Sequence, residues 1–137
     1  MPNDFENLDS FLDGWEIDPL NAKPAFTQYR QILSQDGVSL SFKARPGVSY
    51  SLRAQHINQT KRELFVLVDV VDDEPESRWL SVCFYADMVS DPKEVGDFVP
   101  QGLMNEDAIC FNLDEDDSDQ QAYIAERLQE ALNNAAK

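Results

Sequence analysis

Few side chains in this sequence combine the residue types and the spacing that chemistry requires. The one histidine, His56, would have to serve any Ser-His-acid or Cys-His site, but no suitable partner is patterned around it. We therefore interpret it as a surface residue. Asp69 is a stronger candidate, because it interrupts an apolar run and a buried carboxylate is costly unless it is paired. It is interpreted as half of a structural ion pair with Arg78 or Arg53, as a residue at a strand end that reaches solvent, or as a functional acid in a pocket.

The acidic run over 114–119 imitates the first positions of an EF-hand calcium loop. Its sixth position, however, is Asp119 where the loop needs glycine, and its twelfth is Ala125 where the loop needs glutamate. We interpret the run as the solvated start of a helix and predict no metal site. The sequence also has no phosphate-binding glycine loop and no dinucleotide fingerprint, so we predict no cofactor.

The two cysteines, Cys83 and Cys110, both lie in apolar stretches and belong to no close-spaced Cys/His pair. We expect two buried, reduced thiols, as is usual in the cytoplasm. The alternative is a disulfide or redox pair. It would require the two segments to lie side by side with their Cα atoms within about 7 Å.

Charge is distributed unevenly along the chain. The net charge is −15, yet residues 37–62 carry five basic residues and no acidic one, so a +5 segment lies within a −20 remainder. A field of that sign repels nucleic acid and anionic membranes, and we expect neither as a partner. The basic segment either binds an anionic partner or neutralises the chain's own acidic arm or its 114–119 run. The predicted binding residues are Lys43, Arg45, Arg53, Lys61 and Arg62.

Length and composition predict one folded domain after an acidic arm. The chain has 137 residues, 42% of them hydrophobic, which suffices for one proper core. No apolar run approaches the roughly 20 residues that cross a bilayer, and the acidic start is unlike a secretory signal. We expect a cytoplasmic protein with an acidic N-terminal arm over 1–20 and a single α+β domain over 21–137.

The arm can form a short amphipathic helix. Phe5, Leu8, Leu12 and Trp15 recur at i, i+3, i+7 and i+10, which places them in one apolar stripe. Such a stripe either docks on the chain's own domain or recognises another protein or a second copy of this chain.

Alternation and turn residues predict an antiparallel meander sheet of about five strands with two helices packed on it. The strands are expected over 38–45, 48–55, 63–72, 78–86 and 108–113, and the helices over 24–36 and 119–134. The strands over 63–72 and 78–86 are almost continuously apolar, so we expect them to be central and covered on both faces. Residues 86–106 are expected to form a loop, and 72–77 a solvated turn.

The number of residues in the loop of the first hairpin is constrained by the alternation of apolar and polar residues in its two strands. A two-residue loop at Pro46 and Gly47 would place polar residues opposite apolar ones, whereas a three-residue loop keeps all apolar residues on one face. We predict a loop of residues 45–47, with Ala44 opposite Val48, and with Gly47 in the left-handed conformation.

These features favour a non-enzymatic protein-interaction module that self-associates, for instance as a homodimer. The alternative is an enzyme or small-ligand-binding protein with a pocket that gathers Asp69, Trp79 or Tyr85 with a basic residue. The order of elements in a small acidic chain also resembles that of type III secretion chaperones, which implies a secretion-chaperone-like protein. This sequence departs from that family in lacking a helix between its third and fourth strands.

Overall fold

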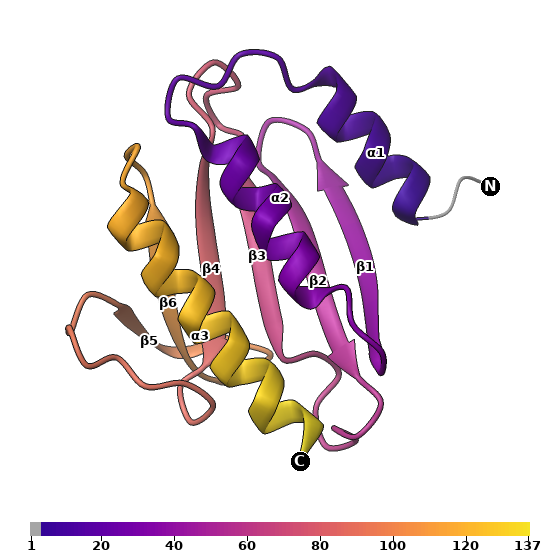
Figure 1. Cartoon of the computed structure of the whole chain (residues 1–137), viewed down its shortest axis with the longest axis vertical. Helices are drawn as coiled ribbons and strands as arrows, with labels where there is room; N and C mark the ends of the chain where they lie inside the picture. Colours follow the sequence, from indigo (N-terminus) through magenta and orange to yellow (C-terminus); the bar gives the residue numbers. More distant parts are fainter. Residues whose placement is uncertain (1–3) are drawn as a thin grey trace.

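One six-stranded antiparallel sheet carries three helices in the computed structural model, which describes residues 4–137 (Figure 1). The helices are α1 (Asp4–Gly14), α2 (Ala22–Leu33) and α3 (Ser118–Ala136). The strands are β1 (Val38–Arg45), β2 (Ser49–His56), β3 (Val66–Val71), β4 (Trp79–Tyr85), β5 (Asp97–Leu103) and β6 (Glu106–Leu113). The predicted α+β class is confirmed.

The strand order is β1-β2-β3-β4-β6-β5, so the first four strands form a meander and β6 lies between β4 and β5. The strands over 66–71 and 79–85 are the two central ones, as predicted. The sixth strand, β5, lies within the segment expected to be a loop. Its alternation is hidden by Pro100 and Gly102 and by a register shift between Val99 and Leu103.

Side-chain caps explain where the helices begin. The carboxylate of Asp18 accepts hydrogen bonds from the backbone N–H groups of Ala22 and Lys23, at 2.8 and 2.9 Å. Asp18 lies three residues before the N-cap of α2, Asn21, which forms no side-chain cap bond itself, and α2 begins two residues before the predicted position. Asp117 is itself the N-cap of α3, and its side chain accepts a hydrogen bond from Gln120 N.

The first hairpin has the predicted parity but not the predicted register. Its three-residue loop is 46–48 rather than 45–47, because Arg45 pairs with Ser49. Gly47 has φ +84°, as expected for its left-handed position. Two contacts fix the loop here: Val48 N donates to Arg45 O at 2.8 Å, and Gly47 N donates to Asp72 Oδ2 at 2.8 Å.

Helices α2 and α3 lie next to each other across one face of the sheet, and α1 lies beside β1 (Figure 1). The core forms between these helices and the inward positions of the strands, which alternate with half-exposed positions along β3 and β4. Within residues 4–137, no helix has the length and apolar composition that crossing a membrane would require.

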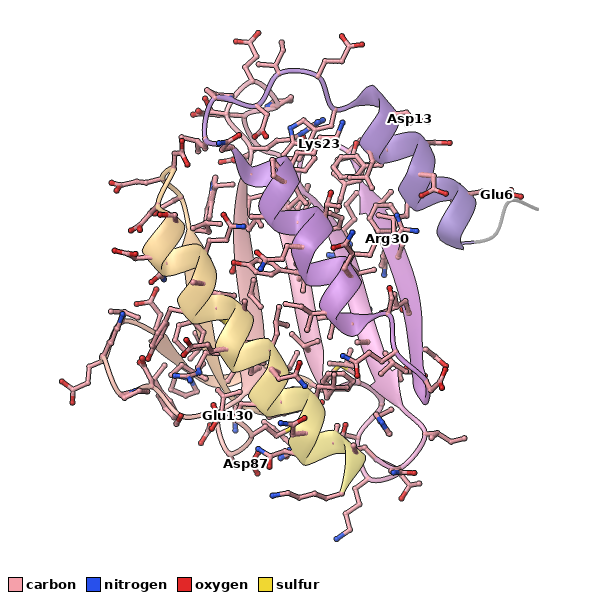
Figure 2. The ribbon with its side chains drawn as sticks, in the orientation of Figure 1. Glu6, Asp13, Lys23, Arg30, Asp87 and Glu130 are labelled. Carbon is pink, nitrogen blue, oxygen red and sulfur yellow. A yellow bond between two sulfur atoms is a disulfide. The ribbon has the colours of Figure 1, made fainter. Side chains whose placement is uncertain are left out.

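The stripe of α1 packs against the chain's own domain. Leu8 and Trp15 are 1% exposed and belong to the core, and Leu12 packs on it; the side chain of Phe5 lies outside the described part of the structure. A polar contact reinforces this docking: Arg30 of α2, labelled in Figure 2, forms a 3.0 Å ion pair with Asp9 of α1.

The turn over 72–77 is not fully solvated, because Asp72 is 2% exposed. Arg78 Nε donates to Asp72 Oδ1 at 2.6 Å. The Arg78 guanidinium also lies 5.2 Å from the Phe11 ring centroid and 5.6 Å from those of Trp15 and Tyr50. One buried ion pair thus joins the β3–β4 connection, the first hairpin and α1. The connection itself contains no helix.

Candidate functional site

The face of the sheet opposite α2 and α3, here called the open face, has no helix or strand over it among the described residues. The strand pairing places its side chains in rows across the sheet. The middle row is Lys43, Ser51, Asp69, Ser81 and Asn112. One flanking row is Ser41, Arg53, Leu67, Cys83, Cys110 and Asp97, and the other is Arg45, Ser49, Val71 and Trp79.

Apolar side chains flank the polar middle row on the two central strands of the open face. Leu67 and Val71 on β3 and Trp79 on β4 are all half-exposed, although they stand on the two central strands. The expectation that both faces of these strands are covered is therefore wrong for this chain alone. A continuous apolar run predicts that both faces of a strand are buried. It does not show whether the same chain or a partner buries the second face.

The expectation of two reduced thiols is also wrong, because Cys83 and Cys110 form a disulfide. The two residues stand directly opposite each other on β4 and β6, with their Cα atoms 4.1 Å apart. This adjacency is the condition stated for the disulfide alternative. Both residues are half-exposed on the open face, so the disulfide extends the apolar row of Leu67 toward β6.

The β1–β2 side of the open face is basic. Lys43 and Arg45 are exposed and Arg53 is half-exposed. Across residues 4–137, none of the three forms an ion pair with a carboxylate, from either α1 or the 114–119 run. Arg53 Nε donates to Ser51 Oγ at 3.4 Å. Three predicted binding residues therefore share one surface and retain donors for a partner.

The opposite side of the open face, on β5 and β6, is acidic. Asp97 on β5 is exposed and stands opposite Cys110, where its Oδ2 accepts a 3.4 Å hydrogen bond from Asn112. Asp114 directly follows β6, is exposed, and continues the alternation of Cys110 and Asn112. The open face therefore changes from basic through apolar to acidic across the sheet.

Asp69 lies at the middle of this surface and lines no cavity found within the described chain. Its Oδ1 is buried and has no hydrogen-bond partner. Burial raises the pKa of Asp69, against the lowering effects of the Ser51 hydroxyl and of the charges on Arg53 and Arg45. The ion pair considered with Arg78 does not form, because Arg78 pairs with Asp72.

The other two predicted binding residues, Lys61 and Arg62, lie elsewhere, in the β2–β3 loop beside a polar cavity of about 480 Å³. Arg62 forms ion pairs of 2.9 Å with Asp87 and 2.8 Å with Glu106, and its guanidinium lies 4.0 Å from the Tyr85 ring centroid. Hydrogen bonding to Arg62 lowers the pKa of Asp87. The basic segment thus divides into a sheet cluster and a loop cluster.

His56 is buried, at 9% exposed, rather than a surface residue as predicted. Its Nδ1 accepts a 3.0 Å hydrogen bond from Asn58 N just after β2 ends. The side chain therefore satisfies a backbone donor at the end of the strand, which gives it a structural role.

Asp97 was not identified from the sequence, because it lies in the segment expected to be a loop, where residues cannot be assigned to a face of the sheet. Asp114 was recognised only as part of the acidic run. Comparisons of the chain with protein-family models, with curated proteins and with solved structures find no match.

Proposed function

We propose that this chain is a non-enzymatic protein-interaction module that docks another polypeptide against its open face. The observation that carries the proposal is the pair of half-exposed apolar patches on the two central strands, Leu67 beside the Cys83–Cys110 disulfide and Val71 beside Trp79. Exposed apolar patches bordered by polar residues are typical of interaction sites. Here the polar row of Asp69 and Ser81 lies between the two patches, and charged side chains lie at the borders of the face.

The size of the open face suits this role. Six strands spaced about 4.8 Å apart, each about six residues long at 3.3 Å per residue, give a face of roughly 600 Å². A partner of equal size would bring the total buried area to about 1,200 Å², the lower end of specific interfaces. We therefore expect a reversible complex rather than a permanent one.

The surroundings of Asp69 support docking over catalysis or small-ligand binding. A small-ligand site is usually a concave pocket with converging polar groups. Asp69 instead stands within a sheet surface, and its unpartnered Oδ1 needs a hydrogen-bond donor that an incoming surface can supply.

The test uses two copies of the full chain with different tags, expressed in the native cell. Trp79→Glu places a charge in an apolar patch of the open face, and Lys137→Glu provides a charged control at an exposed position outside that face. We expect at least one polypeptide, the second tagged copy included, to co-purify with the wild type and the control but not with Trp79→Glu.

Binding is then measured with the purified polypeptide, after circular dichroism has established that Trp79→Glu is folded. Leu67→Glu serves as a second variant of the face if Trp79→Glu fails to fold. If every polypeptide that co-purifies does so equally with the face variant and the control, the proposal is refuted.

A further inference from the structure

We propose that the partner on the open face is a second copy of this chain, related by a two-fold axis that runs parallel to the strands between β3 and β4. This inference rests on the proposed function and names the occupant of the same surface. Two sheets stacked face to face in this way have nearly aligned strands, as in β-sandwiches. The symmetry places β3 over the partner's β4, β2 over the partner's β6, and β1 over the partner's β5.

Charge complementarity carries the argument. The two-fold axis brings the basic β1–β2 side of one copy over the acidic β5–β6 side of the other. Lys43 then lies one row along the strands from the partner's Asp97, and Arg45 lies one strand across from the partner's Asp114. Each contact occurs twice, as an isologous interface requires. A chain of net charge −15 resists self-association at long range, so local pairing of opposite charges is what this contact needs.

The rows in the middle of the face also match under this symmetry. Leu67 falls opposite the partner's Cys83, and Val71 falls opposite the partner's Trp79, which brings apolar surface onto apolar surface. In the row between them, Asp69 falls opposite the partner's Ser81. The Ser81 hydroxyl is a donor at the position where the buried Asp69 Oδ1 has none.

The sheet edges are poorer sites for self-association. On β5, Pro100 cannot donate to a neighbouring strand, and the register shift between Val99 and Leu103 distorts the edge. On β1, the contact with α1 and the charged Lys43 and Arg45 oppose pairing with another strand. The open face is therefore the surface we assign to the second copy.

The test is a charge-swap experiment by sedimentation equilibrium on the full chain. Variant one is Lys43→Glu/Arg45→Glu, and variant two is Asp97→Lys/Asp114→Lys. Matched controls with the same changes in net charge are Lys93→Glu/Lys137→Glu and Glu74→Lys/Glu76→Lys, at exposed positions outside the open face.

We expect the wild type to dimerise with a dissociation constant of about micromolar, in line with its modest interface. Each swap variant alone should dimerise roughly 30-fold or more weakly, because four attractive contacts become repulsive. An equimolar mixture should form a heterodimer of nearly wild-type affinity, since every contact is again between opposite charges. Both controls should dimerise within about threefold of the wild type.

A monomeric wild type at millimolar concentration overturns the inference, as does a dimer that both swap variants form normally. A mixture that fails to recover the affinity overturns the two-fold arrangement. The proposed function is tested independently of the second copy. If the chain is monomeric but binding of another polypeptide still requires Trp79, docking on the open face stands and only the second copy is excluded.

Discussion

Asp72→Ala should destabilise the fold more than its position in a turn suggests. The substitution removes the carboxylate that accepts from Arg78 Nε at 2.6 Å and from Gly47 N at 2.8 Å. The side chain of Asp72 is 3% exposed and that of Arg78 is 14% exposed, so solvent cannot easily replace either contact. The variant therefore leaves a largely buried guanidinium without a counter-charge.

Removing one partner of a buried ion pair costs about 3–5 kcal/mol, because the remaining charge stays desolvated. We expect the free energy of unfolding to fall by about 4 kcal/mol. Unfolding entropy is roughly 2.1 cal/mol/K per residue, so a chain of 137 residues should lose about 14 °C in Tm. Asp73→Ala, at the exposed neighbouring position, should change the free energy of unfolding by less than about 0.5 kcal/mol.

The assay is urea unfolding followed by circular dichroism, with Arg78→Met and the double variant completing a double-mutant cycle. The double variant should recover most of the loss, since it buries neither charge. The conclusion that the buried Asp72–Arg78 ion pair stabilises the fold would be refuted by either of two results. One is a loss below about 1 kcal/mol in the free energy of unfolding of Asp72→Ala, and the other is a double variant no more stable than Asp72→Ala.

Three further predictions concern stability. Closure of a loop of 27 residues by the disulfide implies that Cys83→Ser/Cys110→Ser lowers the free energy of unfolding by about 3.5 kcal/mol, measured in urea without reductant; equal stability would contradict this. Burial raises the pKa of Asp69 in the fold, so the folded state keeps a proton that the unfolded state releases, and stability falls as pH rises through that interval. Asp69→Asn should therefore have a higher Tm than the wild type at pH 7, at concentrations where the chain is monomeric, and the difference should disappear near pH 3. Gly96→Ala should cost about 1–3 kcal/mol, because its Cβ would meet two β6 side chains at 2.8 Å, whereas Gly14→Ala, with nothing within 4 Å, should unfold like the wild type.

The apolar patterns predicted five of the six strands, the first two by alternation and the two central ones by continuous apolar runs, because these signals are local. Alternation also fixed which residues of the first hairpin share a face, since a one-residue slip would move every apolar side chain to the wrong side. The exact loop could not be predicted in this way. Loops over 45–47 and 46–48 both keep the apolar residues on one face, so the sequence pattern does not distinguish them. Tertiary contacts do, here the hydrogen bond from Gly47 N to Asp72.

The β5–β6 hairpin was missed for a different reason. Its two-residue turn consists of Met104 and Asn105, with φ of 50° and 66°, and it lacks the Asn-Gly or Asp-Gly pair that usually indicates such turns. Without that hairpin, Asp97 could not be assigned to a face. The basic half of the open face could therefore be predicted from the sequence, while the acidic half required the structure.

The position of α3 after all six strands has a consequence for how the chain folds during synthesis. The inner face of the sheet and one side of α2 depend on α3 for their cover, through residues such as Tyr123, Ile124 and Leu128. At about 5–20 residues per second, translation of its 19 residues takes roughly 1–4 s. Until α3 has been made and has docked, part of the inner apolar layer of the sheet has no cover. Transiently exposed apolar surface of this kind favours aggregation.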